Sequence, residues 1–256
     1  MQTTTACLKF LLFTILTLIT IPIQLIVMLF HKGKYSYALP YLWQNATIKI
    51  FSIKLKIIGT PITNQQIIYV SNHISYLDIP VIGSVLRASF VAKKDVASWP
   101  LFGFLSKLQQ TAFISRNRNN ARQEKNTLDQ MLINGKSLII FPEGTSTDGR
   151  EVLPFKSSLF SIALKNSENN MLIQPITLTM TLANGKKIEN QETRDIYAWH
   201  INMDTPLHVH LWGFAKTKGA EITMEFHPPI NPSDYSDRKE LAKACHSTVS
   251  NTLNKI

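Results

Sequence analysis

The sequence predicts an α/β fold: a single mixed, largely parallel sheet flanked by helices, behind an N-terminal membrane helix. Beyond residue 52, short apolar runs rich in β-branched residues alternate with stretches of helical character. Repeated alternation of this kind is typical of parallel sheets covered by helices. Ahead of these runs, no charged residue occurs from Phe10 to Phe30, and a run of about 20 apolar residues can cross a ~30 Å hydrocarbon layer.

Length and charge limit the kinds of protein that this chain can be. At 256 residues it can form one sizeable core together with a membrane element. Its formal net charge of +10 predicts an anionic partner, such as nucleic acid, an anionic lipid surface or a phosphorylated substrate. Cys7 and Cys245 form no disulfide or zinc pattern, which is typical of a reducing compartment.

We expect residues 1–31 to form a transmembrane or re-entrant membrane anchor. Pro22 and Gln24 favour a kinked or re-entrant helix over a straight span. A cleaved signal peptide is the alternative, but no small-x-small site follows the apolar run. Lys32 and Lys34 follow at once, so the positive-inside tendency places the rest of the chain on the cytoplasmic side, at the inner membrane if the source is bacterial.

Residues 32–58 are predicted to be an interfacial amphipathic segment, and residues 59–256 a single domain. Aromatic side chains suit a membrane interface, because their rings lie between lipid and water. The aromatic residues that suggest this placement are Tyr35, Tyr37, Tyr41 and Trp43. The alternative is an ordinary amphipathic helix packed on the core, and the sequence does not separate the two.

The elements expected next alternate in type. The predicted strands are Ile53–Ile58, Ile67–Val70, Ser89–Ala92, Thr111–Ser115, Ser137–Phe141, Leu172–Thr179 and Glu221–His227. The predicted helices are Ile79–Leu86, Trp99–Leu108, Asn119–Ile133, Ser157–Leu164 and a closing helix Ser233–Leu253 with Ser233 as its N-cap. In such a sheet, ligands bind at the carboxyl ends of the strands.

The first polar cluster follows the second strand and offers a histidine and an aspartate five residues apart. On an ideal helix this separation turns through about 140°, so His73 and Asp78 would not share a face. If they meet, His73 lies on the turn after the strand and Asp78 near the start of the next helix, where Pro80 is tolerated. An ionised carboxylate beside an imidazole makes a better general base. The alternative is a polar turn with a capping aspartate.

Basic residues follow the next two strands. Lys93 and Lys94 come after the third strand and Arg116 after the fourth. Arginine at a strand end offers a planar fork of donors that suits phosphate. The alternative is a solvated basic surface.

A sharp turn follows the fifth strand. Glu143 and Gly144 form a Pro-Glu-Gly turn that is followed by Thr145, and Lys156 adds a cation nearby in the sequence. Glycine permits a backbone conformation, or a close ligand approach, that other residues do not. The turn therefore places a carboxylate and a hydroxyl at the carboxyl edge of the sheet.

Together these clusters resemble the glycerolipid acyltransferase family, which includes 1-acylglycerol-3-phosphate acyltransferases. The first family block, Asn-His, four residues and Asp, is Asn72, His73 and Asp78. The second, Gly-x-Ile-Phe-Ile-x-Arg, corresponds to residues 110–116, and the third, Phe-Pro-Glu-Gly-Thr-Arg-Ser, to residues 141–147. The fourth, an apolar segment ending in proline, is residues 173–176. The blocks occur in the family's order and spacing.

Two of the four blocks depart from the family pattern. Gln110 replaces the glycine that opens the second block, and Ser146 and Thr147 replace the arginine and serine of the third. The resemblance associates both blocks with the glycerol-phosphate acceptor, so the departures concern its head group rather than the chemistry.

The resemblance implies acyl transfer from acyl-CoA or an acyl-carrier protein to the free hydroxyl of a lysophospholipid in the bilayer, with no other cofactor and no metal. The first expected acceptor is 1-acylglycerol-3-phosphate, which gives phosphatidic acid. His73 would be the general base, Asp78 would orient it, and Arg116 would bind the acceptor's phosphate. The other expected substrate-binding residues are Asn72, Glu143, Gly144, Thr145 and Lys156.

Three alternatives remain. Several segments also resemble the branch of the family that acylates lyso-ornithine lipid. A non-enzymatic membrane protein that binds nucleic acid or lipid predicts basic residues interleaved with aromatics, whereas the arginines here follow strands. A metal-dependent hydrolase lacks a second histidine near His73, although His208 and His210 share one side of a possible strand.

Overall fold

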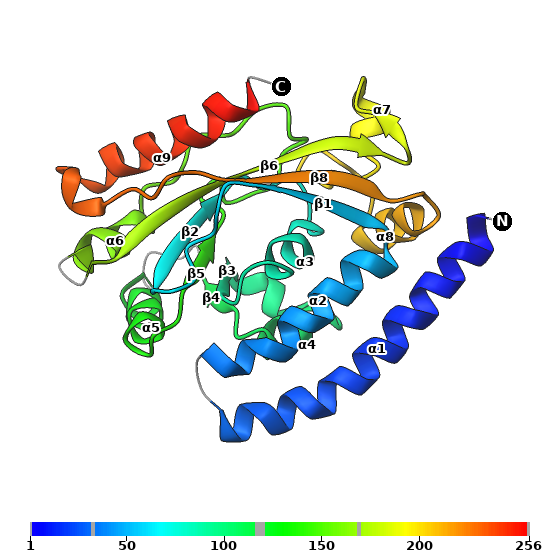
Figure 1. Cartoon of the computed structure of the whole chain (residues 1–256), viewed down its shortest axis with the longest axis horizontal. Helices are drawn as coiled ribbons and strands as arrows, with labels where there is room; N and C mark the ends of the chain where they lie inside the picture. The colour runs from blue at the N-terminus through cyan, green and yellow to red at the C-terminus, as the bar shows by residue number, and fades with distance from the viewer. Residues whose placement is uncertain (1, 32–33, 116–120, 168–169, 255–256) are drawn as a thin grey trace.

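The computed structural model describes residues 2–31, 34–115, 121–167 and 170–254. Its strands form a single sheet in the order β1-β8-β6-β2-β5-β3-β4, with β7 paired to β6 (Figure 1). The strands are β1 (Ile53–Ile58), β2 (Ile67–Ser71), β3 (Ser89–Lys93), β4 (Ala112–Ile114), β5 (Leu138–Ile140), β6 (Leu172–Ala183), β7 (Lys186–Lys187) and β8 (Ala220–Phe226).

The sheet is mixed and mostly parallel, which confirms the predicted fold class. The pairs β1–β8, β2–β6, β2–β5, β3–β5 and β3–β4 are parallel, whereas β6 runs antiparallel to β7 and β8. β2 lies between β6 and β5, and each of its residues is buried. The carboxyl ends of β2 and β5 therefore meet at the same edge, near the middle of the sheet.

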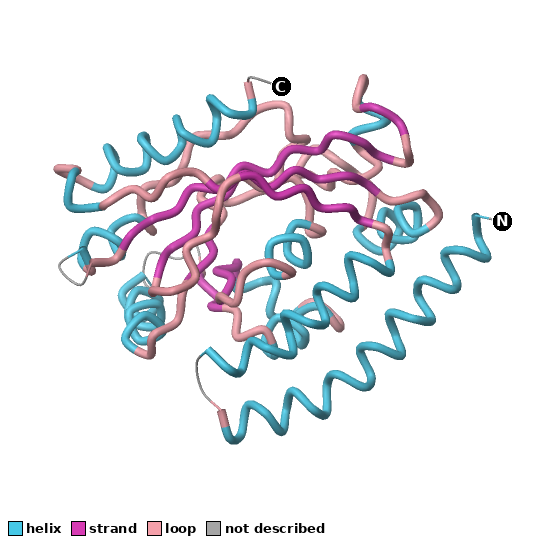
Figure 2. The backbone as a smooth tube through the Cα atoms, viewed as in Figure 1, coloured by secondary structure: helices cyan, strands magenta, loops and turns pink. Residues whose placement is uncertain are grey.

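Helices cover both faces of the sheet (Figures 1 and 2). The helices are α1 (Gln2–Phe30), α2 (Ala38–Ile50), α3 (Asp78–Gly83), α4 (Phe102–Leu108), α5 (Ala121–Ile133), α6 (Phe160–Lys165), α7 (Gln191–Arg194), α8 (Leu207–Ala215) and α9 (Arg238–Leu253). Short 3₁₀ helices are η1 (Lys34–Tyr37), η2 (Lys94–Ser98) and η5 (Pro232–Asp234).

Successive side chains of β2 pack into two different core clusters, one on each face of the sheet. Ile67 and Tyr69 belong to the cluster that includes residues of α1, α2, α3 and α8. Ile68 and Val70 belong to the cluster with residues of α5, α6 and α9. Because successive side chains of a strand point to opposite faces, an apolar run buried on both sides is what a central parallel strand requires.

The first two helices pack together beside this core. By length and composition, α1 is long and apolar enough to cross a membrane. α2 forms within the predicted interfacial segment and buries Gln44, Thr47 and Ile48. Among its flanking aromatics, Tyr35 is exposed, whereas Tyr37 is buried and its hydroxyl lies 2.5 Å from Ser89 Oγ.

Three predicted details are wrong. His208 and His210 lie on helix α8 rather than on a strand. The cap of α9 is Asp237, not Ser233, because the Asp237 carboxylate accepts hydrogen bonds from the backbone N–H groups of Lys239 and Glu240. α4 begins at Phe102 rather than Trp99, since Leu101 has a left-handed φ of 60° that interrupts the helical path.

Candidate active site

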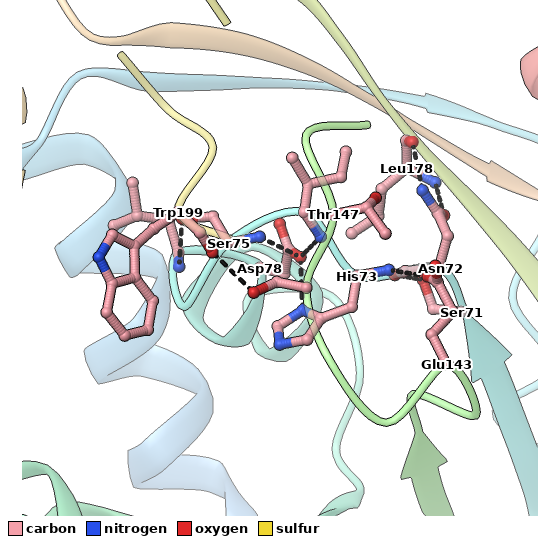
Figure 3. Close-up of polar contacts among 12 residues, drawn as sticks. Ser71, Asn72, His73, Ser75, Asp78, Glu143, Thr147, Leu178 and Trp199 are labelled. Atoms are coloured by element: carbon pink, nitrogen blue, oxygen red, sulfur yellow. Dashed lines mark hydrogen bonds and ion pairs between the residues drawn. The ribbon is translucent and has the colours of Figure 1, made fainter. Parts of the chain in front are cut away.

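His73 lies on the loop that leaves the carboxyl end of β2, and Asp78 is the first residue of α3. The loop folds back on itself, with Asp78 N donating to Ser75 O at 3.0 Å. This turn brings His73 Nδ1 to 2.8 Å from Asp78 Oδ2 (Figure 3). The two residues, which could not share a helix face, therefore meet across the turn.

The imidazole of His73 is only partly covered. Its side chain is 20% exposed, whereas that of Asp78 is fully buried. Phe141, which follows β5, stacks on the ring with centroids 4.1 Å apart. With Nδ1 donating to Asp78, the neutral ring carries its free lone pair on Nε2. The site thus holds a ring nitrogen that is able to accept a proton.

Four donors surround the Asp78 carboxylate. Oδ2 accepts hydrogen bonds from His73 Nδ1, from Ile74 N at 2.7 Å and from Ser75 N at 3.0 Å, and Oδ1 accepts one from the Tyr197 hydroxyl at 2.9 Å. These hydrogen bonds fix the position of both carboxylate oxygens. The side chain of Asp78 does not cap α3; it organises the loop before the helix instead.

Glu143 lies beside this loop but is 2% exposed. Its Oε1 accepts a hydrogen bond from His73 N, and its Oε2 accepts one from Leu153 N, each at 2.8 Å. Burial raises the pKa of Glu143 to about 7, although the two backbone hydrogen bonds oppose the shift. Both oxygens are thus taken by the main chain, and contact between Glu143 and the acceptor stays a prediction.

The turn after Glu143 brings a lysine to the same edge. Gly144 has a φ of +68°, and a β-carbon at this position would lie 2.5 Å from Lys156 Nζ. The backbone of Lys156 is fixed by its N–H bond to Pro142 O at 2.9 Å. The backbone conformation favours glycine here, and a larger residue would also displace the flexible end of the Lys156 side chain. Lys156 is exposed and Thr145 half-buried.

Asn72 points away from the site. Its side chain is buried and pairs with both backbone groups of Leu178 on β6, accepting from the N–H at 2.7 Å and donating to the carbonyl at 3.0 Å. This pairing ties the end of β2 to its neighbouring strand.

Of the basic residues that the sequence places after strands, Arg116 lies outside the described residues. Lys93 and Lys94 lie where β3 meets η2.

The residues that depart from the family pattern have structural partners. Gln110 adopts a φ of 60° where the family has glycine; its Nε2 donates to Ser36 Oγ at 2.6 Å and its Oε1 accepts from Lys136 Nζ at 2.8 Å. Ser146 Oγ donates to Trp199 O at 2.7 Å, and Thr147 N donates to His73 O at 2.9 Å.

Sequence reasoning missed the segment from Tyr197 to Trp199. Trp199 N donates to Ile74 O at 3.1 Å (Figure 3), so this segment contacts the loop of His73 from a position more than 100 residues further along the chain. It belongs to none of the four blocks and has no strand or helix pattern. No local signal in the sequence could have identified it.

An apolar cavity of about 180 Å³ lies next to the same loop. Tyr76, Leu77, Ile79 and Pro80 line one side of it, and side chains of α1, α2, η2, α4 and α8 line the rest. Its surface is almost entirely apolar, which suits a hydrocarbon chain better than a polar head group.

Metal ligation was the alternative use of these residues. In the part of the chain that the structure describes, no three histidine, cysteine or acidic side chains gather as a metal site. His210 is committed elsewhere: its Nδ1 is 2.8 Å from the Tyr76 hydroxyl and its Nε2 is 2.9 Å from Asp195 O.

Comparison with known proteins agrees with the residue blocks. The Acyltransferase family model matches residues 54–179. A lyso-ornithine lipid O-acyltransferase of Rhodobacter capsulatus is 35% identical over 204 residues, which cover 79% of this chain and 71% of that protein. A 1-acyl-sn-glycerol-3-phosphate acyltransferase of Neisseria gonorrhoeae is 28% identical over 184 residues, covering 72% and 68%.

The fold has a counterpart among solved structures. The 1-acyl-sn-glycerophosphate (LPA) acyltransferase PlsC from Thermotoga maritima matches with a TM-score of 0.68 at 20% identity, over 100% of this chain and 97% of that one. At this identity the match shows a common fold. Because the family model and the relatives agree, this chain belongs to the glycerolipid acyltransferase family and is an O-acyltransferase of the lysophospholipid type.

Proposed function

We propose that this protein transfers an acyl group from a thioester to the free hydroxyl of a lysolipid, with His73 as general base and Asp78 as the group that orients it. The observation that carries the proposal is the 2.8 Å contact between His73 Nδ1 and a buried carboxylate. This contact leaves Nε2 free on a ring that remains partly exposed.

The proposed reaction is a direct transfer. Nε2 takes the proton of the acceptor hydroxyl as its oxygen attacks the thioester carbonyl, since an unassisted hydroxyl is a poor nucleophile near neutral pH. The carbon–sulfur bond then breaks, an ester forms, and the departing thiolate takes the proton from the imidazolium. The donor is acyl-CoA or an acyl-carrier protein, and no further cofactor takes part.

Two acceptors are candidates. Lyso-ornithine lipid is favoured by the higher identity to the Rhodobacter relative, and by Ser146 at the position where the third family block carries an arginine. The second candidate, 1-acylglycerol-3-phosphate, is supported by the Neisseria relative. In that case Arg116 and Lys156 would provide the cations for its phosphate.

The apolar cavity is the proposed site for an acyl chain. Tyr76 and Leu77, within the loop between His73 and Asp78, are among the residues that line it. A chain lodged there would place its polar end near the dyad. α1 lines this cavity and also exposes leucine and isoleucine side chains on its other face. Because an exposed apolar face of this kind suits contact with lipid, we infer that α1 binds the bilayer and that the lipid substrates enter from there.

An acceptor panel tests this function. Purified protein with labelled acyl-CoA or acyl-carrier protein would be offered lyso-ornithine lipid, 1-acylglycerol-3-phosphate and other lysophospholipids. We expect a labelled diacyl product from one of the first two acceptors, and from lyso-ornithine lipid at the higher kcat/KM. Turnover of neither one, with both donors, would contradict the proposal.

A further inference from the structure

Tyr197 reaches the dyad from outside the region that the family model matches. It follows α7, 18 residues after the end of that match at residue 179. Its side chain is fully buried, and its hydroxyl donates to Asp78 Oδ1 at 2.9 Å. This is a long-range contact to the residue that orients His73.

The two oxygens of Asp78 have different partners. Oδ2 is shared by His73 and two backbone N–H groups, whereas Oδ1 accepts the hydrogen bond from Tyr197. Rotation of the carboxylate about its Cβ–Cγ bond would move Oδ2 away from His73 Nδ1. The Tyr197 hydroxyl opposes this rotation, because the carboxylate plane must keep Oδ1 pointed toward it.

The phenol itself is held rigidly. Its ring packs edge-on against Phe214 of α8, with centroids 6.1 Å apart, and Tyr197 N donates to Arg194 O at 3.1 Å. Two residues further on, Trp199 N donates to Ile74 O. Burial, reinforced by the charge of Asp78, raises the pKa of Tyr197 well above its usual value. The phenol therefore keeps its proton and acts as a donor.

We propose that Tyr197 is a positioning residue for acyl transfer, whose hydroxyl fixes the Asp78 carboxylate so that Oδ2 holds the His73 ring with Nε2 toward the acceptor hydroxyl. The inference rests on the proposed roles of His73 and Asp78. It adds a residue from the segment after β6 to a site that the sequence blocks place entirely between residues 70 and 176.

The hydrogen bond also has an electrostatic consequence. It offsets part of the Asp78 charge that the imidazolium of His73 would otherwise experience. Among the described residues, Glu143, from the loop after β5, interacts electrostatically with Asp78, and Tyr76, from the loop of Asp78 itself, interacts with Tyr197. Without the phenol, more of the Asp78 charge would act on the imidazolium, so the pH–rate profile is a readout that a purely structural role of Tyr197 would not change.

Tyr197→Phe removes the hydroxyl and keeps the ring. The matched control is Tyr69→Phe on β2, whose side chain is 3% exposed and whose hydroxyl donates to Ile62 O. Both variants lose one buried tyrosine hydrogen bond, but only one of these bonds is to Asp78. Thermal melting in detergent would compare their stability, and the acceptor with the fastest turnover would serve for kinetics.

For Tyr197→Phe we expect kcat to fall about tenfold or more, as for the loss of one hydrogen bond to a charged group, with KM for both substrates little changed. The acid limb of its pH–rate profile should move to higher pH. Tyr69→Phe should melt at a similar temperature and keep the wild-type kcat and profile.

Two outcomes would overturn the inference. One is a Tyr197→Phe protein with wild-type kcat and pH profile. The other is a loss of rate in the same proportion at every pH, matched by Tyr69→Phe, which indicates a role in folding alone. His73→Gln, measured in parallel, separates this inference from the proposed function: if that variant is inactive while Tyr197→Phe is unaffected, the inference about Tyr197 fails and the dyad stands.

Discussion

Two buried carboxylates hold the loop that carries His73. Asp78 accepts from the imidazole and from the loop that follows it, whereas Glu143 accepts from the main-chain N–H of His73 itself. The ring and its backbone are therefore fixed separately, one by each acidic residue. Such support limits the conformations of a catalytic loop before substrate binds.

Glu143 should make stability depend on pH. Its folded pKa, about 7, is above the usual value of 4.5, so its contribution to stability is complete below the unfolded pKa and is lost as pH rises through 7. We expect the free energy of unfolding of the wild type to fall by about 2–3 kcal/mol between pH 4.5 and pH 8 from this group.

Glu143→Gln removes that ionisation, so its unfolding free energy should lack this fall. At acid pH this variant should be less stable than the wild type. The NH₂ group of the amide is a donor, so it cannot accept the hydrogen bond from one of the two backbone N–H groups. Denaturant unfolding in detergent at several pH values measures both effects, with exposed Glu189→Gln as the control. Identical pH dependence in wild type and Glu143→Gln would contradict the assignment.

The sequence predicts some of these residues and not others. His73 and Asp78 are identifiable because the residues between them are contiguous and one turn is enough to bring the two together. Tyr197 is not identifiable, since its contact with Asp78 spans 119 positions and depends on how the segment after α7 packs. Gln110 could be recognised as a departure, but its bridging role depends on Ser36 and Lys136, which are distant in sequence.

Among the elements, α1 has two different faces. Its buried residues recur at intervals of three, four or seven and form one stripe: Ala6, Lys9, Phe13, Thr17 and Gln24. Lys9 Nζ donates to Thr217 O just after α8, and Gln24 Nε2 donates to Leu108 O at the end of α4. The opposite face exposes leucine and isoleucine, including Leu11, Leu18 and Ile26.

These contacts limit how α1 could meet a membrane. Lys9 and Gln24 are separated by about 22 Å along a helix, and the folded domain contacts α1 at both positions. A perpendicular span would carry much of that domain into the hydrocarbon, which its polar surface opposes. We propose that α1 is embedded in one leaflet by its exposed face.

Cysteine labelling tests this orientation. In a Cys7→Ser background, where buried Cys245 is the remaining native cysteine, Gln2→Cys marks the start of α1 and Asn251→Cys marks α9. A membrane-impermeant maleimide should label both in the same sealed inverted vesicles. Labelling of Asn251→Cys in intact vesicles, with Gln2→Cys reacting only after detergent is added, would show that α1 spans the bilayer.

The strands were more predictable than the helices. β1 has the predicted bounds, and the other predicted strands that the structure contains differ by a few residues at their ends, because apolar β-branched runs between turns are a local signal. The helix α8 was missed because its sequence, apolar apart from His208 and His210, has no amphipathic helical periodicity. Its conformation depends on tertiary contacts, such as Trp212 on Phe10 and Phe214 on Tyr197.

At the scale of the whole molecule, the cavity exists only because several elements converge. α1, α2, α4 and α8 each contribute lining residues, as does the loop between His73 and Asp78 through Tyr76 and Leu77. Apolar composition indicated an anchor in the sequence, but the enclosed space depends on how these helices cross. It could not be predicted from any one of them.

Filling this cavity should change the preference for acyl-chain length. Ser106 lines it from α4, and a phenylalanine there would exclude at least two methylene groups, worth about 1.6 kcal/mol or about tenfold in kcat/KM. For Ser106→Phe we expect the ratio of kcat/KM for palmitoyl over octanoyl substrates to fall by that factor.

Exposed Ser158→Phe, outside the cavity, is the matched control and should keep the wild-type ratio. An unchanged ratio in Ser106→Phe would show that the acyl chain lies elsewhere.

The central claim is that His73 removes the proton of the lysolipid hydroxyl. The most direct measurement is kcat for His73→Gln with the preferred acceptor, alongside its binding to phospholipid vesicles and its melting temperature. We predict a loss of about 10²–10⁴-fold in kcat, because an amide cannot take the proton, with membrane binding and folding unchanged. A folded, membrane-bound His73→Gln protein with kcat within threefold of the wild type would contradict the account.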